Sequence, residues 1–206
     1  MAKINVYHGS GCEVKNPSLA YGREDADFGV GFYVTFDLEM AERWAARRKT
    51  PVISVYEVDF DCLNGLEFEL NKGWLDFVVE NRSGNKRTSI DLSEVDYIVG
   101  ATADDRLFAV IEQYESNLID SEVAVEALDS MQIGNQIALR TEEALKNLEY
   151  THSYILTEAR KEQLKEQLLQ ARMESNRIVE GILKKRVEQE NRKEGPAPVF
   201  RKRKDR

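Results

Sequence analysis

Two short segments near the start of the chain carry residue types that could do chemistry. The first, Tyr7-His8-Gly9-Ser10, places an imidazole and a hydroxyl beside a glycine. In the second, residues 27–35 (DFGVGFYVT), two glycines flank a small residue and precede two aromatic residues and a threonine. Because glycine lets the backbone pass where a side chain would clash, this pattern predicts a tight passage that delivers an aromatic ring into a cleft. Each segment alone is a weak signal, so the interpretation depends on their joint occurrence.

A third segment, Asn135-Gln136-Ile137-Ala138-Leu139, completes the set. In order and spacing, the three segments resemble the motifs of ADP-ribosyltransferases of the His-Tyr-Glu type. The chain looks most like a bacterial, toxin-like branch of that superfamily, in which we expect a DFGxGFYxT segment, an Ala-Asp-Asp stretch (103–105 here) and a glutamine in the third motif. The resemblance covers about residues 3–150 and does not extend to the C-terminal part.

The resemblance implies that the matching residues bind NAD+. His8 would hydrogen-bond the ribose on the adenine side, and the Gly9 backbone would hold the nicotinamide carboxamide. Tyr33 would stack on the nicotinamide ring, since aromatic faces favour flat, electron-poor partners.

Four further residues have supporting roles in this hypothesis. Gly31 would let the backbone close on the dinucleotide without a Cβ clash, and the hydroxyls of Ser10 and Thr35 would orient the groups that touch it. Arg23, in the loop upstream, is the predicted pyrophosphate ligand because its planar fork matches phosphate oxygens.

The implied reaction breaks the bond between nicotinamide and ribose through an oxocarbenium-like transition state. A glutamate usually stabilises the developing charge and positions the acceptor, whereas this chain has Gln136 there. An amide oxygen can accept a ribose hydroxyl, but it brings neither charge nor a general base. Glu142 and Glu143 could substitute only if the preceding strand is shorter than expected.

Three functions therefore remain open. The favoured one is mono-ADP-ribosylation of a macromolecule, protein or nucleic acid, by an NAD-dependent transferase. This enzyme would act as a bacterial toxin in a toxin–antitoxin or defence system, with an antitoxin as a partner. The alternatives are an NAD+ glycohydrolase, in which water is the acceptor, and a catalytically inactive module that binds NAD+ or a partner.

Short strands and short helices alternate along residues 1–156. We expect strands at 4–7, 32–36, 52–58, 95–100, 136–140 and 153–156. We expect helices after Asp37 and at 74–80, 106–116 and 121–131, with a helical turn at 141–143. Residues 12–31 predict a loop over the site. The pattern indicates an α+β domain, and the resemblance implies an ADP-ribosyltransferase-like split β-sandwich.

Several polar residues allow more than one interpretation. Asp104 and Asp105 could form a metal pair, although Asp104 is better explained as the cap of the next helix. Asn81 and Arg82, expected in a polar loop, could line the acceptor side of the cleft or form an ion pair. The hypothesis includes no metal.

The C-terminal part changes character. Residues 157–194 predict a long helix with a heptad-like apolar line through Leu164 and Ile182 and a second line through Leu169 and Val187. This helix could self-associate, dock on the domain or accept a partner. Residues 195–206 form a basic tail, and from Arg192 onward seven lysines and arginines stand against two acidic residues. Such a tail is commonly flexible and solubilising, but it could also contact nucleic acid or an acidic surface.

Composition narrows the function classes. The 206 residues carry a net charge of −8 and have a pI near 5.0, which disfavours a general nucleic-acid coat. The two cysteines, Cys12 and Cys62, make neither a disulfide framework nor a zinc site. Without a signal peptide or a long apolar run, we expect a cytoplasmic protein with no membrane partner.

Overall fold

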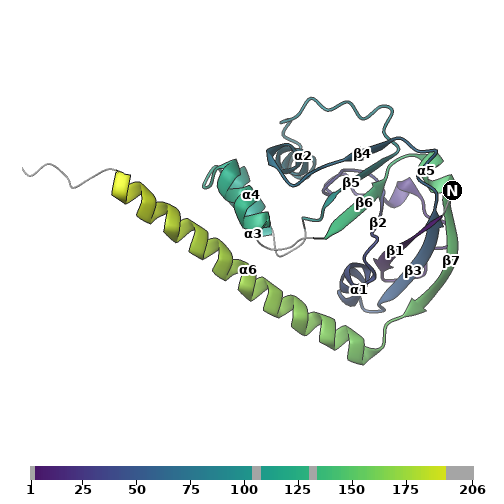
Figure 1. The fold of residues 1–206 in the computed structure, drawn as a ribbon. Coiled ribbons are helices and arrows are strands. Elements are labelled where there is room, and N and C mark those ends of the chain that lie inside the picture. Colours follow the sequence, from purple (N-terminus) through teal and green to yellow (C-terminus); the bar gives the residue numbers. More distant parts are fainter. Residues whose placement is uncertain (1–2, 104–107, 130–133, 194–206) are drawn as a thin grey trace, which may run out of the picture.

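Two small sheets form the centre of the fold, and helices lie on their outer sides (Figure 1). The computed structural model describes residues 3–103, 108–129 and 134–193. The first sheet has the order β1-β3-β7 and is antiparallel throughout. Its strands are Ile4–Ser10 (β1), Val52–Val58 (β3) and Leu148–Ile155 (β7). The central strand β3 is buried along nearly its whole length, in keeping with its mostly apolar sequence.

The second sheet has the order β2-β6-β5-β4. Its strands are Phe32–Val34 (β2), Asn135–Leu139 (β6), Tyr97–Ala101 (β5) and Gly65–Glu67 (β4), and only the β4–β5 pair is parallel. One isolated bridge connects the two sheets. In it Tyr7 and Thr35 exchange backbone hydrogen bonds of 2.9 and 3.0 Å.

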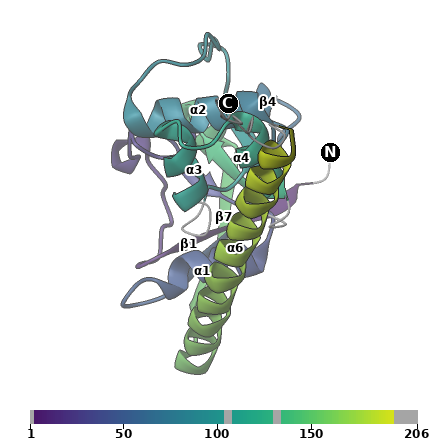
Figure 2. The ribbon, with the colours of Figure 1, turned by 90° about the vertical axis from the view of Figure 1, so that its left-hand side faces the viewer.

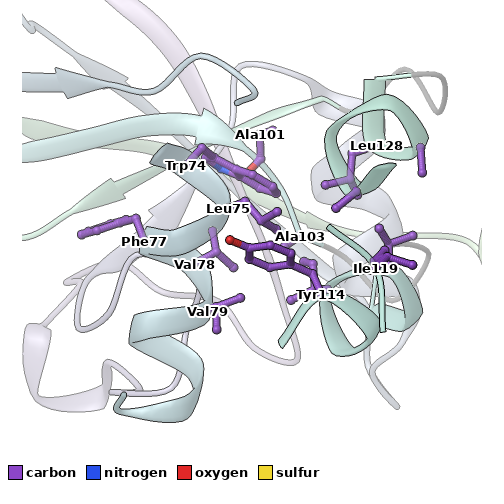
Figure 3. Close-up of a cluster of buried hydrophobic side chains, with 14 of the residues drawn as sticks. Trp74, Leu75, Phe77, Val78, Val79, Ala101, Ala103, Tyr114, Ile119 and Leu128 are labelled. Atoms are coloured by element: carbon purple, nitrogen blue, oxygen red, sulfur yellow. The ribbon is translucent and has the colours of Figure 1, made fainter. Parts of the chain in front are cut away.

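Three buried clusters hold these layers together. One lies between the sheets and takes Val6 and Tyr56 from the first and Phe32 and Ile137 from the second. A second cluster covers the outer face of the first sheet. The third packs helices against the second sheet, and Figure 3 shows its side chains around Trp74. The domain is therefore an α+β arrangement of two packed sheets, as the alternation of short elements predicts.

The helices of the domain begin where the sequence supplies caps. Asp37 accepts hydrogen bonds from the first turn of α1 (Leu38–Ala46), and Asn71 does the same for α2 (Lys72–Ser83). Gly84 ends α2 in the left-handed conformation, with φ +73°. The other helices of this part are η1 (Leu19–Tyr21), α3 (Phe108–Glu115), α4 (Ser121–Asp129) and α5 (Glu142–Lys146).

The long helix α6 (Glu158–Lys193) docks on the domain. Figures 1 and 2 show it running past α1 near its start and past α4 further along. Leu164 is buried in the cluster on the first sheet, and Val179 is buried in the cluster around Trp74. Leu169, Met173 and Val187 are exposed, so part of the second apolar line stays open to solvent. Docking is thus observed, and self-association through residues 157–194 stays a prediction.

Several boundaries differ from those expected. Asn81 and Arg82 belong to α2 and not to a loop, because Gly84 and not Asn81 ends the helix. Strand β4 was not expected, since three residues of mixed polarity carry no alternation signal. Strand β7 begins at Leu148 and not at 153. Strand β6 ends at Leu139, so Glu142 and Glu143 fall in α5, beyond the strand.

Asp104, Asp105 and the basic tail at 195–206 lie outside the described residues. Within the described part of the chain, no helix has both the length and the apolar character needed to cross a membrane.

Candidate functional site

Alternation along β2 and β6 places Tyr33 and Gln136 on one face of the second sheet. Phe32 and Ile137 point into the cluster between the sheets, so their neighbours Tyr33 and Gln136 point the other way. Tyr33 is paired with Ala138, two residues from Gln136 in the adjacent strand. Two residues separated by 103 positions in the sequence therefore lie close together on this face.

The edge of β1 brings His8 and Gly9 to the same region. Tyr7 turns its backbone groups toward Thr35, and in a strand the groups that point to one edge recur at every second residue. The N–H and C=O of Gly9 therefore point to this edge too. The bridge is isolated among the described residues, so the pairing does not continue to Gly9.

A cleft of about 1230 Å³ joins these groups. Of the residues predicted to bind or act, six line it: His8, Gly9, Arg23, Gly31, Tyr33 and Gln136. The loop between β1 and β2 forms much of the rim, and the end of α1 and part of α3 contribute other lining residues. The loop is fixed near its start, because Val14 N–H donates to Ser54 Oγ at 3.1 Å and Tyr56 donates to the Val14 carbonyl.

The two remaining predicted residues do not line the cleft. Ser10 Oγ donates to the carbonyl of Cys12 at 2.7 Å and stabilises the turn after β1. Thr35 is fully buried, where its hydroxyl donates to the Asn135 carbonyl at 2.9 Å and accepts from Asp37 N–H at 3.1 Å. Thr35 thus connects β2, β6 and the start of α1 and does not line the cleft.

His8 is held as a neutral acceptor toward the cleft. Its Nδ1 lies 2.7 Å from the carbonyl oxygen of Tyr33, and a carbonyl can only accept, so Nδ1 carries the proton and Nε2 keeps its lone pair. Burial lowers the pKa of His8 and outweighs the opposing effect of this hydrogen bond. The ring packs on Phe32 with 4.5 Å between the centroids.

The Tyr33 hydroxyl is used inside the protein. It donates to the Gly29 carbonyl at 2.8 Å and accepts from Phe28 N–H at 3.0 Å, which ties the ring to the glycine turn. Burial raises the pKa of Tyr33, so the phenol stays protonated at neutral pH. Gly29 has φ +72°, and a Cβ there would approach Asn81 Oδ1 to 2.9 Å. The turn therefore requires glycine at this position.

A nearly buried polar network of Asp27, Arg82 and Gln136 forms part of the cleft lining. Asp27 Oδ1 accepts from Arg82 Nε at 2.9 Å and from Arg82 Nη2 at 2.6 Å. Asp27 Oδ2 accepts from Gln136 Nε2 at 2.6 Å and from Ala103 N–H at 2.9 Å. Arg82 also donates to the Ala103 carbonyl. One carboxylate thus ties together the 26–31 turn, α2, the end of β5 and β6.

Comparison with protein families gives a match for the two-sheet part of the chain. Residues 4–150 match the profile of the family described as "Protein of unknown function (DUF3990)". The chain belongs to the DUF3990 family. Neither a curated protein nor a solved structure matches it. The match ends before α6, so the family region corresponds to the two-sheet part of the molecule.

Two features of this DUF3990 chain were missed from the sequence. The Asp27–Arg82 pair joins residues 55 positions apart, and the only signals were the Asp in the DFG segment and the Asn81-Arg82 dipeptide. Arg82 lines the cleft and forms its ion pair from α2 and not from a loop, and its place on the acceptor side stays a prediction. Arg47 and Arg48, which directly follow α1, also line the cleft and were not among the predicted site residues.

Arg23, predicted to bind pyrophosphate, lies at the cleft but is engaged locally. Its Nε donates to Asp25 Oδ1 at 2.9 Å, which raises the pKa of the guanidinium, and its side chain is 73% exposed. Among the described residues of this DUF3990 member, no group of three or more His, Cys, Asp or Glu side chains is placed to hold a metal ion.

Proposed function

We propose that the chain binds NAD+ in the cleft and transfers its ADP-ribose to a macromolecule. The observation that carries the proposal is the convergence of His8, the open backbone edge at Gly9, Tyr33 and Gln136 on one cleft. A peptide N–H and C=O at a strand edge match a carboxamide, which presents an N–H donor and a C=O acceptor side by side. The side chains alone would suit many ligands, whereas this edge favours nicotinamide.

The size of the cleft supports a dinucleotide ligand. Sites for small molecules usually enclose about 300–1,000 Å³, and this cleft has about 1230 Å³. It has room for NAD+ together with part of an acceptor. Arg47 and Arg48 at the end of α1 supply positive charge to the same lining, which suits a pyrophosphate.

The proposed reaction breaks the glycosidic bond between C1′ of the ribose and the nicotinamide nitrogen. Nicotinamide leaves with the bonding electrons, a nucleophile of the acceptor forms the new bond to C1′, and the acceptor's proton passes to solvent. Gln136 would accept a hydrogen bond from a ribose hydroxyl and hold the sugar in place. The carboxylates of Glu112 and Glu115 on α3 line the same cleft and are available to stabilise positive charge.

The biological setting follows from the motif resemblance. A cytoplasmic bacterial enzyme that modifies a macromolecule at the expense of NAD+ would be toxic unless held in check. We therefore propose a toxin of a toxin–antitoxin or defence system, with an antitoxin as its partner. Expression of the chain in bacteria should arrest growth, and Tyr33→Ala should relieve the arrest.

One observation favours the two alternatives in which ADP-ribose is not transferred to a macromolecule. Gln136 is neutral, its amide is engaged with Asp27, and Asp27 is paired with Arg82. This trio offers no unpaired carboxylate to activate an acceptor. With water as the acceptor the chain would be an NAD+ glycohydrolase, and without turnover it would be an NAD+-binding module.

The deciding experiment incubates the full chain with adenylate-labelled NAD+ and a bacterial lysate, followed by separation of protein from nucleic acid. Label in either fraction supports transfer and gives the acceptor class. Release of free ADP-ribose without incorporation supports the glycohydrolase, and binding without turnover supports the binding module. Gln136→Ala should lower incorporation, whereas Gln167→Ala on the exposed face of α6 is the matched control and should not.

A further inference from the structure

The carboxylate of Asp27 is surrounded by donors alone. Among the described residues, its hydrogen-bond donors are two nitrogens of the Arg82 guanidinium, the Ala103 N–H and the Gln136 Nε2, at 2.6–2.9 Å. Asp27 is 8% exposed and Gln136 is 4% exposed, so water does not replace these bonds. A buried carboxylate that accepts four hydrogen bonds is held in a single orientation. Asp27 therefore has a fixed position in the site.

This contact fixes which way the Gln136 amide points. A carboxylate can only accept, so the amide must present its NH₂ group to Asp27 and hold its carbonyl oxygen on the opposite side. Gln136 lines the cleft and shares a sheet face with Tyr33. We propose that Asp27 is a positioning residue that orients the Gln136 amide so that Oε1 is offered as an acceptor to a ligand hydroxyl in the cleft.

The inference rests on the proposed function, in which that hydroxyl belongs to the ribose next to nicotinamide. An amide without such a partner can turn by 180° and present either a donor or an acceptor. Arg82 prevents the carboxylate itself from turning, because its two nitrogens bind Asp27 Oδ1 together. The order of influence therefore runs from Arg82 through Asp27 to Gln136.

Substitutions that exchange the two functional groups test this directly. Asp27→Asn keeps the shape. Because the Arg82 donors are charged, the introduced amide offers its oxygen to Arg82, and its NH₂ group faces both Gln136 Nε2 and the Ala103 N–H. The Gln136 amide then turns and presents a donor to the cleft. Loss of one hydrogen bond to the ribose is worth about a tenfold fall in the rate of nicotinamide release.

The reciprocal change supplies the rescue. Gln136→Glu alone places two carboxylates in contact, and both cannot be ionised at that spacing. While protonated, the introduced acid donates to Asp27 and imitates the native amide, so this variant should be more active at about pH 5.5 than at pH 8. Asp27→Asn combined with Gln136→Glu restores one donor–acceptor pair and the original net charge.

The measurement is the rate of nicotinamide release and the KM for NAD+ in the full chain, with urea unfolding of each variant. Asp27→Asn lowers the logarithm of the rate of nicotinamide release. We expect the double variant to recover at least half of that decrease, mainly through kcat. Asp61→Asn, at an exposed position outside the cleft, is the matched charge control and should resemble the parent.

The outcomes separate the two levels of the hypothesis. Rescue of kcat by the double variant without an equal recovery of unfolding free energy supports a positioning role, since a merely structural contact would recover both together. The positioning role is overturned if Asp27→Asn turns over NAD+ as fast as the parent chain, or if the double variant shows no rescue. Either result leaves the proposed function in place. A parent chain that neither binds nor cleaves NAD+ overturns the proposed function itself, whatever the variants do in urea.

Discussion

At the scale of single residues, Gly9 sets how closely β1 approaches α1. A Cβ at this position would lie 1.9 Å from the Ala41 carbonyl oxygen and 2.9 Å from Ala45 N, so backbone would have to move. We expect Gly9→Ala to cost about 1–3 kcal/mol of unfolding free energy and to weaken NAD+ binding, because the strand edge would shift. Urea unfolding measures the first effect and titration with NAD+ the second.

Gly181 provides the control for this substitution. It lies in α6 with open space around its Cβ position, so Gly181→Ala should stabilise the helix by about 0.5–1 kcal/mol. If both variants behaved alike, the close approach of β1 to α1 would not be what requires glycine at position 9.

His8 should make stability depend on pH in a defined window. Its pKa is lowered by burial from an ordinary value of about 6.5, so the unfolded chain binds the proton more readily. The contribution of His8 is therefore fully present above about pH 6.5 and is lost as the pH falls below it. His8→Asn should reduce the slope of unfolding free energy against pH between about pH 5 and 7. The reduction should correspond to at most one proton taken up on unfolding. An unchanged slope in His8→Asn would contradict the assignment.

The extent to which the site could be predicted follows from how far its residues are apart in sequence. His8, Gly31 and Tyr33 lie within two short contiguous motifs that the sequence shows directly, and the Tyr7–Thr35 bridge brings these motifs together at the cleft. The partners of Asp27 lie 55, 76 and 109 positions away, and which donor meets that carboxylate depends on the packing of α2 against the sheet. Thr35 shows the reverse case, in which a residue inside a motif serves the fold and does not reach the cleft.

At the scale of elements, α6 shows how an apolar line predicts a helix without predicting its partner. Leu164, on the face of α6 that packs on the domain, is 1% exposed. Leu169, five residues further along the same helix, is 60% exposed. Leu164→Ala should cost about 2–5 kcal/mol of unfolding free energy, and Leu169→Ala should change it by less than about 0.5 kcal/mol. Equal effects in urea unfolding would mean that α6 does not dock as described.

The errors in the predicted elements have physical causes as well. Strand β4 is three residues long and contributes only a half-buried Leu66 to the core, so it leaves no periodic signal. Helix α2 extends through Arg82 because packing of Phe77 and Val78 favours continuation until Gly84 turns the chain. Strong signals such as the apolar run of β3 or the Asp37 cap fix their elements, whereas short or polar ends depend on contacts that are distant in sequence.

At the scale of the whole molecule, α6 joins two parts of the fold that both contribute to the cleft. Near its start, Arg160 binds Glu42 of α1 at 2.6 Å and Leu164 packs on the same helix cluster. Further along, Val179 is buried in the cluster that includes α3 and α4, and Arg186 lies 3.5 Å from Glu126. The ends of α1 and α3 line the cleft, so a stiff helix fixed at both points would hold its width.

This arrangement predicts that weakening both contacts of α6, at Leu164 and at Val179, has additive effects on stability but not on NAD+ binding. Leu164 and Val179 are 15 residues apart, about 22 Å along a helix, so the losses of unfolding free energy from Leu164→Ala and Val179→Ala should add. The losses of NAD+ affinity should not add, because releasing either end already frees the cleft walls from each other. We expect each single variant and the double variant to raise the Kd for NAD+ by a similar factor, about threefold, with Leu169→Ala as the control. Additive effects on Kd, or a Kd that does not change at all, would mean that α6 stabilises the domain without controlling the cleft.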